Sequence, residues 1–186
     1  METPRKKINK IVIIGPESTG KSSLSHALAN HFNGLAVEEY AREYLLTNGT
    51  DYTYENLLDV AKGQLALEDK AIQEIILNQS IRPFAFIDTD MYVMKVWCEF
   101  VFQQCHAFIL DQIVERKYDL YLLCNVDVPW VKDELREYPD LATRQTLYHH
   151  YRDIMLNQQV PWIDISGDYN TRLQTAIAGV EKYCSL

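Results

Sequence analysis

The segment GPESTGKS, residues 15–22, combines two glycines, a lysine and a hydroxyl side chain at a fixed spacing. It matches the pattern G-x-x-x-x-G-K-[ST], in which the glycines let backbone N–H groups curl around phosphate oxygens without interference from a Cβ atom. In such a loop Lys21 reaches the terminal phosphates and the Ser22 hydroxyl ligates Mg²⁺. The segment predicts a nucleoside triphosphate site; the alternative is a glycine-containing turn with a chance lysine.

The predicted nucleotide site extends over the whole loop and into the helix that follows it. We assign nucleotide binding to Gly15, Pro16, Glu17, Ser18, Thr19, Gly20, Lys21, Ser22 and Ser23. A helix that begins near Lys21 adds the positive end of its dipole to the phosphate site. The sequence contains no N/T-K-x-D guanine motif, which favours ATP over GTP. We therefore predict that the loop binds ATP and that Ser22 takes part in binding Mg²⁺.

Acidic residues follow two further apolar runs, where a carboxylate can act on a metal ion or a substrate. The run FAFID ends at Asp88, a second candidate ligand of Mg²⁺, and Asp90 lies two residues further on. After the run LAV, Glu39 is a candidate general base that takes a proton from a substrate hydroxyl. Acids are also common in loops and at helix N-termini, so the choice of base between Glu39 and Asp90 stays open.

A polar segment of about 125–145 follows the fourth apolar run and has the composition of a lid. In phosphoryl transfer, mobile arginines neutralise charge on the transferred group, and a closing lid excludes water. Arg136 and Arg144 are the candidates here, and the alternative is that both lie on a solvated helix. The complete predicted catalytic set is Lys21, Glu39, Asp88, Asp90, Arg136 and Arg144.

Short apolar runs alternate with segments of helical periodicity along the chain, and a break is predicted near His106 in the helical region from Met91 to about Lys117. Strands are predicted at 11–14, 35–39, 84–88, 118–124 and 161–166. Five strands alternating with helices predict an α/β fold of the P-loop NTPase type, with a parallel sheet covered on both faces. Ligands of such sheets bind beyond the carboxyl ends of the strands.

The bulk composition limits the partners of this protein. A chain of 186 residues predicts one domain, 1–186, and the net charge of −8 argues against a non-specific nucleic-acid or membrane surface. No segment approaches the ~20 apolar residues of a membrane span. The four cysteines show no CxxC spacing, so we expect buried thiols and a cytoplasmic location. The oligomeric state stays open.

Six segments together resemble the ribosylnicotinamide kinase domain of NadR-type proteins: GPESTGKS, EEYAREY, AKGQLALEDKA, FIDTD, YDLYLLCNVDVPWVKDELR and ISGDYNTRLQTA. The resemblance covers the chain from about Asn9 to the last helix. The phosphate loop is a general pattern, whereas EYARE, GQ and DTD in combination are more specific.

The resemblance implies ATP-dependent phosphorylation of the 5′-hydroxyl of nicotinamide riboside, giving nicotinamide mononucleotide and ADP. It also implies a nucleoside-kinase-like fold with an arginine-bearing lid. The NadR-type proteins carry an adenylyltransferase domain before the kinase domain. Because the phosphate loop here begins at residue 15, we do not expect adenylyl transfer or DNA binding.

One position departs from the family pattern. A tryptophan that stacks on the pyridine ring is expected before the Glu-Tyr pair, and this chain has Glu38 there. Its carboxylate is a hypothetical electrostatic substitute beside a cationic pyridinium. We assign acceptor binding to Glu38, Tyr40, Arg42 and Asp90. A kinase for another nucleoside, and an ATP-binding sensor that contacts a partner protein, remain the alternative functions.

Overall fold

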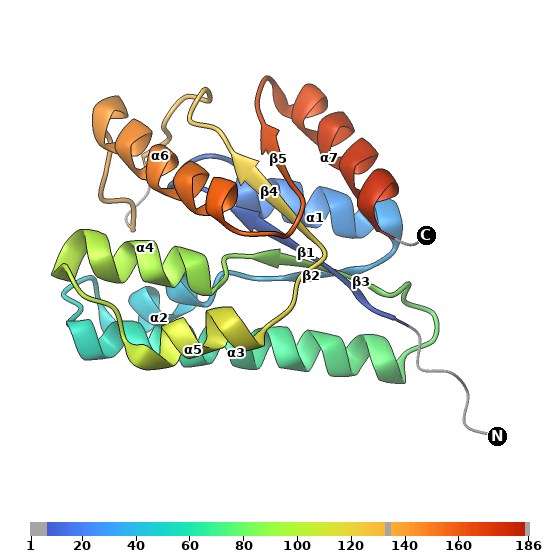
Figure 1. Cartoon of the computed structure of the whole chain (residues 1–186), viewed down its shortest axis with the longest axis horizontal. Helices are drawn as coiled ribbons and strands as arrows, with labels where there is room; N and C mark the ends of the chain where they lie inside the picture. Colours follow the sequence, from blue (N-terminus) through green and yellow to red (C-terminus); the bar gives the residue numbers. More distant parts are fainter. Residues whose placement is uncertain (1–6, 133–134, 185–186) are drawn as a thin grey trace.

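The computed structural model describes residues 7–132 and 135–184. Its five strands form one parallel sheet in the order β2-β3-β1-β4-β5 (Figure 1). The strands are β1 (Asn9–Ile14), β2 (Leu35–Val37), β3 (Phe84–Asp88), β4 (Leu120–Cys124) and β5 (Trp162–Ile165). The predicted five-stranded parallel sheet is therefore confirmed. Residues 133 and 134 of the predicted lid, and both ends of the predicted domain, lie outside the described residues.

Helices connect the strands, as the periodicity predicts. They are α1 (Lys21–Phe32), α2 (Tyr40–Asn48), α3 (Tyr54–Leu77), α4 (Met91–Phe102), α5 (Ala107–Glu115), α6 (Leu141–Asn157) and α7 (Tyr169–Tyr183). The predicted break near His106 is confirmed, because this residue is the N-cap of α5. Thr53 caps α3, where its side chain accepts a hydrogen bond from the backbone N–H of Asn56.

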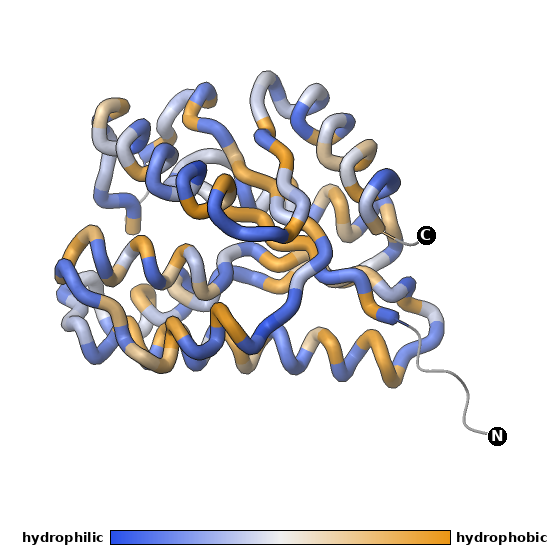
Figure 2. The backbone as a smooth tube through the Cα atoms, in the orientation of Figure 1, coloured by the Kyte–Doolittle hydropathy of each residue, from blue (hydrophilic) through white to orange (hydrophobic). Residues whose placement is uncertain are grey.

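The two faces of the sheet are both buried, and β1 shows why. Alternate side chains of a strand point to opposite faces. Ile11 and Ile13 belong to the apolar cluster with α1 and α7, whereas Val12 and Ile14 belong to the cluster with α3, α4 and α6. All four side chains are fully buried, which explains the continuous apolar run. Figure 2 shows this apolar centre between helices of mixed hydropathy.

A third apolar cluster joins α2, α3, α4 and α5 beside the sheet. Through α2, this cluster adjoins the loop after β2 that contains Glu38 and Glu39. No helix in the described part of the chain combines the length and the apolar character that crossing a membrane requires.

The parallel arrangement brings the loops after the strands to one edge of the sheet. The phosphate loop follows β1, and the predicted lid follows β4. One predicted boundary is wrong. β2 ends at Val37, so Glu38 and Glu39 lie beyond the strand, because the ladder with β3 ends at the pair Val37 and Ile87. Arg144, at the end of the predicted lid, lies in the first turns of α6, which Asp140 caps.

We predict that Leu28→Ala, a substitution in α1 against the sheet, lowers the free energy of unfolding by about 2–5 kcal/mol. The side chain of Leu28 is fully buried, so its removal leaves a cavity. Leu77→Ala is the matched control, because Leu77 at the end of α3 is 82% exposed. Equilibrium unfolding in urea measures both variants. Equal losses in the two variants would contradict this assignment of the core.

Candidate active site

The phosphate loop turns sharply between β1 and α1, and glycine is required at its start. Gly15 has φ 141°, and a Cβ there would lie 2.7 Å from the backbone oxygen of Cys124. The backbone of the loop thus passes directly against β4. Gly20, with φ 79°, precedes the first residue of α1. Within the described residues the amide N–H groups of residues 20–22 donate to no protein acceptor, as expected for a first helical turn that receives an anion.

Lys21 lies folded over this loop. Its Nζ atom donates a hydrogen bond to the backbone oxygen of Pro16 at 3.0 Å, and the Thr19 hydroxyl donates to the same oxygen at 2.7 Å. Lys21 is only 9% exposed. Its ammonium group is therefore held at the phosphate loop by a neutral carbonyl that a phosphate oxygen can replace.

Ser22 and Asp88 form the contact between the phosphate loop and β3. The Ser22 hydroxyl donates to Oδ2 of Asp88 at 2.5 Å. The pKa of the buried Asp88 carboxyl is raised to about 6, first by burial and second by the Glu39 carboxylate. Lys21 and the Ser22 hydrogen bond act in the opposite direction.

The same pair fits the predicted Mg²⁺ site. A hydroxyl and a carboxylate oxygen are hard ligands, and Mg²⁺ in phosphoryl-transfer proteins is held by one or two such groups together with phosphate oxygens. No cluster of three or more His, Cys, Asp or Glu side chains suited to a metal occurs among the described residues. The Ser22 and Asp88 oxygens would supply two ligands of such a site.

Asp90 caps α4 and is not among the residues that line the cavity described below, so its catalytic and acceptor-binding roles stay predictions. It is the N-cap of α4, and its Oδ1 accepts from the backbone N–H groups of Tyr92 and Val93. Its Oδ2 accepts from the Tyr121 hydroxyl at 2.8 Å. The carboxyl group is buried, which raises its pKa to about 6. Both oxygens thus accept hydrogen bonds inside the protein, and one of the donors, the backbone N–H of Val93, belongs to a residue that lines the cavity.

Two of the predicted acceptor-binding residues also lie outside the cavity. Glu38 is exposed, and its Oε1 atom lies 2.9 Å from Nε2 of His26 on α1. The ring of Tyr40 packs on α3 at Gly63, where a Cβ would lie 2.0 Å from the ring. Glu38 stands where the family pattern has a tryptophan, but its carboxylate does not line the cavity. The assignments of Glu38 and Tyr40 to acceptor binding stay predictions.

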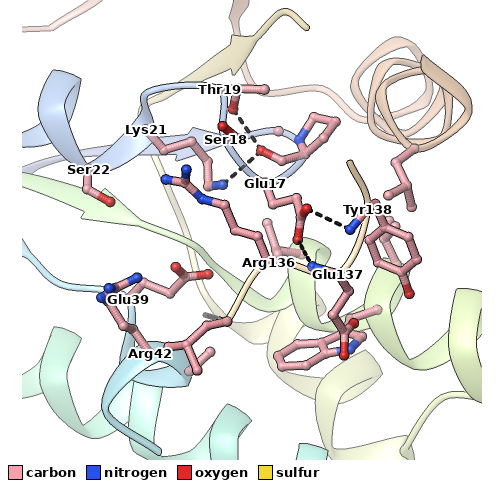
Figure 3. A pocket seen from close by; sticks show the side chains of 18 of the residues that line it. Glu17, Ser18, Thr19, Lys21, Ser22, Glu39, Arg42, Arg136, Glu137 and Tyr138 are labelled. Carbon is pink, nitrogen blue, oxygen red and sulfur yellow. Dashed lines mark hydrogen bonds between the residues drawn. The ribbon is translucent and has the colours of Figure 1, made fainter. Parts of the chain in front are cut away.

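One cavity of about 270 Å³ lies at this edge of the sheet. Residues 15–23 line it on one side, and Glu39, Arg42 and Arg136 line it as predicted site residues from other segments (Figure 3). The opposite wall is apolar and aromatic, with Val93, Val96, Trp97 and Phe100 from α4, Leu147 and Tyr151 from α6, and Tyr138. No sequence motif predicted this wall, although positions 93, 96, 97 and 100 share helical spacing directly after FIDTD.

Glu39 is the N-cap residue of α2, but its side chain makes no capping bond. Glu39 lines the cavity instead. Its Oε1 atom accepts a hydrogen bond from the Thr89 hydroxyl at 3.4 Å. Thr89 has φ 77°, which is rare for a β-branched residue and typical of backbone held in a strained state at functional sites. The Thr89 hydroxyl thus lies between the Glu39 and Asp88 carboxylates.

The lid is docked on the phosphate loop through Glu17 (Figure 3). The Glu17 carboxylate accepts from Nε1 of Trp130 at 3.2 Å and from the backbone N–H groups of Glu137 and Tyr138 at 2.9 and 2.8 Å. Arg136 precedes these two amides and lines the cavity. Glu17, predicted only as part of the nucleotide loop, therefore also determines where the lid arginine lies.

Arg144 lies apart from the cavity lining, on α6, and is 4% exposed. Its Nε and Nη1 atoms are buried and have no hydrogen-bond partner among the described residues. A buried guanidinium with unpaired donors is energetically costly unless a ligand or a rearrangement pairs it. Arg144 thus lies on a helix, and its role as a lid arginine stays a prediction.

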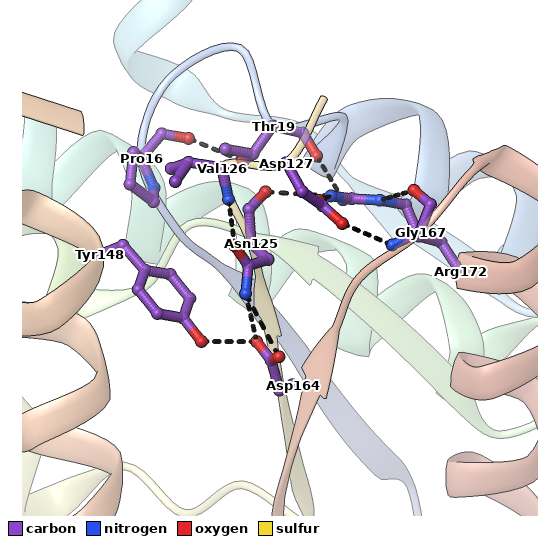
Figure 4. A network of polar contacts seen from close by, with 9 residues as sticks. All are labelled: Pro16, Thr19, Asn125, Val126, Asp127, Tyr148, Asp164, Gly167 and Arg172. Carbon is purple, nitrogen blue, oxygen red and sulfur yellow. Dashed lines mark hydrogen bonds and ion pairs between the residues drawn. The ribbon is translucent and has the colours of Figure 1, made fainter. Parts of the chain in front are cut away.

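Arg172 on α7 was not predicted, and it joins three loops of the site (Figure 4). Its guanidinium donates to the backbone oxygens of Thr19, Asn125 and Gly167 at 2.9, 3.0 and 2.8 Å, and it pairs with Asp127. The side chain is 6% exposed. It thus fixes the phosphate loop relative to the loops after β4 and β5. Its place near the start of the predicted last helix, YNTRLQTAIAGVEKYC, gave no sign of these partners.

A protein-family model described as AAA domain matches residues 10–172. The chain belongs to this family. The family match and the parallel sheet agree with the predicted P-loop fold.

Two curated relatives have the description "Trifunctional NAD biosynthesis/regulator protein NadR". The protein from Salmonella typhimurium is 27% identical over 94% of this chain and 42% of its own length. The protein from Escherichia coli is 28% identical over 89% of this chain and 40% of its own length. The chain thus spans less than half the length of these relatives. The predicted resemblance to NadR-type proteins is confirmed.

Solved structures share the fold of this family member. A NadR protein in complex with NR has a TM-score of 0.76 at 20% identity, covering 96% of this chain and 52% of that chain. A thymidylate kinase from Ehrlichia chaffeensis has a TM-score of 0.67 at 15% identity, covering 94% of this chain and all of that chain. The nucleoside- and nucleotide-kinase-like fold is therefore confirmed.

We predict that Glu17→Ala loosens the lid without unfolding the protein. The variant removes the acceptor for the amides of Glu137 and Tyr138, so these amides should exchange hydrogen faster, and this exchange is the measurement. Glu181→Ala, at an exposed position of α7, is the control and should leave the exchange unchanged. Unchanged exchange at the lid in Glu17→Ala would show that Glu17 does not hold it.

Proposed function

We propose that this protein transfers the γ-phosphoryl group of ATP to the 5′-hydroxyl of nicotinamide riboside, with Mg²⁺ as the metal. The products are nicotinamide mononucleotide and ADP. The observation that carries the proposal is the single cavity that the phosphate loop, Glu39 and the aromatic wall line together. Such a cavity has room for a phosphate donor at one end and an acceptor with an apolar ring at the other.

The donor end rests on the phosphate loop. The amides of residues 20–22 and the Lys21 ammonium group would bind the phosphates, and Ser22 and Asp88 would hold Mg²⁺. The bound metal supplies positive charge that offsets the charge of the phosphate oxygens. Deprotonated Asp88 is the form that binds a cation, so cation binding favours its ionisation.

The acceptor end rests on Glu39 and the aromatic wall. Glu39 accepts the proton of the 5′-hydroxyl as that oxygen forms a bond to the γ-phosphorus and the bond to the β–γ bridging oxygen breaks. Trp97 and Phe100 present ring surfaces on which a pyridinium can stack, and an aromatic face also attracts a cation. Arg42 lines the cavity beside Glu39 and is the remaining candidate for contact with the acceptor.

Arginines complete the proposed mechanism. Arg136 lines the cavity from the lid and would neutralise charge on the transferred group. Arg144 carries two buried donor atoms without a partner, which a change in lid or ligand position could pair with an anion. Arg136 is therefore the first candidate for contact with phosphate, and Arg144 the second.

The identity of the acceptor rests on the relatives. The two curated NadR proteins carry NAD biosynthesis in their descriptions, and a neighbouring NadR structure is described as a complex with NR. A second NadR structure is described as a complex with NAD and AMP-PNP. We propose the same ligands for the present chain because it shares the fold of these structures and has a cavity beside its phosphate loop. A cytoplasmic location, suggested by four free cysteines, stays a prediction.

The deciding experiment measures ADP formation by the purified protein with MgATP and one acceptor at a time. We expect kcat/KM for nicotinamide riboside to exceed the values for uridine and for nicotinic acid riboside. The aromatic wall and the Glu39 carboxylate favour a cationic ring over a neutral base or one that carries a carboxylate. Lys21→Ala is the negative control. A higher value for uridine would assign another nucleoside, and ATP binding without any transfer would favour a sensor.

Glu39→Gln tests the proposed base. The amide keeps the size of the side chain but cannot take up the proton, so kcat should fall by about 10²–10⁴-fold. The affinity for an ATP analogue should stay near that of the wild type, because among the described residues Glu39 makes no hydrogen bond to residues 15–23. Steady-state kinetics and calorimetric titration measure the two quantities. An unchanged kcat would assign the proton acceptor to another group.

A further inference from the structure

A buried glutamine side chain binds the backbone just beyond the last residue pair of β2 and β3. The last pair of β2 and β3 is Val37 with Ile87. The next residues, Glu38 and Asp88, both direct their backbone oxygens at the side chain of Gln64 on α3. The Nε2 atom of Gln64 donates to these two oxygens at 3.2 Å each. The carboxamide thus holds the two strand ends apart by a fixed distance instead of letting them pair.

The other end of the same carboxamide holds the chain after Glu39. The Oε1 atom of Gln64 accepts from the backbone N–H of Tyr40 at 2.8 Å. Glu39 is therefore bracketed, since the backbone before it and the backbone after it both bind Gln64. Two carbonyl acceptors and one N–H donor also fix the orientation of the amide, because the flipped amide would place like groups together.

Burial makes this set of bonds specific. Gln64 is 1% exposed, so a side chain without these hydrogen-bonding groups would leave backbone groups of three residues without partners. The preceding residue, Gly63, has no Cβ and thereby admits the Tyr40 ring against α3. Gly63 and Gln64 thus form the surface of α3 that contacts the start of α2.

We propose that Gln64 is a positioning residue for phosphoryl transfer, which sets the separation between Glu39 and the Ser22–Asp88 pair. The inference rests on the proposed kinase function. Glu39 and Asp88 carry like charges, so they repel each other and need a rigid frame to stay at a defined spacing. Gln64 supplies this frame through the backbone, and the Thr89 hydroxyl supports it between the carboxylates.

Gln64→Met tests the proposal, because methionine keeps the length of the side chain but removes all three hydrogen bonds. We expect kcat to fall by roughly 10- to 100-fold, the order of loss for a reacting group displaced by about 1 Å. KM for ATP should change by less than about threefold, since the phosphate loop makes no bond to Gln64 among the described residues. Gln64→Glu is the second variant, and it should lose rate as well because a carboxylate cannot donate to two carbonyls.

Ile75→Ala is the matched control on the same helix. Ile75 is 6% exposed in the apolar cluster of the sheet face, so the variant loses stability while the bonds of Gln64 remain. We expect its kcat to match that of the wild type at a temperature where both are folded. An equal loss of kcat in Ile75→Ala and Gln64→Met would overturn the proposal, because general loosening of α3 would then explain it.

A measurement without turnover separates this inference from the proposed function. Hydrogen exchange of peptides covering residues 38–45, without nucleotide, should be faster in Gln64→Met and unchanged in Ile75→Ala, because only the former frees the Tyr40 amide. Unchanged exchange in Gln64→Met would overturn the positioning role. If the wild type phosphorylates no nucleoside while the exchange responds as expected, the proposed function fails, whereas the positioning of the backbone around Glu39 by Gln64 is supported.

Discussion

The hydrogen bond from Ser22 to Asp88 is the contact on which the candidate site depends. It joins the first turn of α1 to the end of β3, so the phosphate loop and the neighbouring strand share one fixed point. A short bond to a buried carboxylate tolerates little movement, because an unpaired buried charge is costly. The other parts of the site, namely the acid after β2, the lid and the aromatic wall, are arranged around this point.

Three loops are connected to this point by polar side chains rather than by secondary structure. Gln64 connects the loop after β2, Glu17 connects the lid, and Arg172 connects the loops after β4 and β5. Each side chain binds mostly backbone groups, so it fixes the path of the chain and leaves the catalytic side chains free to face the cavity. The loops of a parallel sheet have no ladder of their own beyond the strand ends, and such side chains provide the missing partners.

Charge distribution explains why the site keeps a polar and an apolar half. Lys21 and Arg136 line the side that adjoins the phosphate loop, and Arg42 lines the cavity beside Glu39, within a chain whose net charge is −8 (Figure 3). Two of these three cations thus lie where phosphates would bind, whereas the wall from α4 and α6 is apolar. A small anionic donor and a ring-bearing acceptor suit these two halves better than a polyanion, which the overall negative charge repels.

Local patterns in the sequence were sufficient for the strands, the phosphate loop and the P-loop fold. The run Ile11–Ile14 and the pattern G-x-x-x-x-G-K-[ST] can be recognised from neighbouring residues alone, although the approach of Cys124 adds a tertiary reason for glycine at position 15. The roles of acids and arginines could not be read in the same way. Asp88 and Asp90 stand two residues apart in one acidic motif, yet one contacts Ser22 and the other caps a helix.

The sequence by itself determined the chemistry that is available, and the tertiary structure decided which groups meet. Glu38 and Glu39 are adjacent in the chain, but the end of the β2 ladder turns one to His26 on the surface and the other into the cavity. Gln64 lies 24 residues from both Tyr40 and Asp88, and Arg172 lies 153 from Thr19. Hydrogen bonds over such separations exist only after the sheet has assembled and excluded water, so no local pattern encodes them.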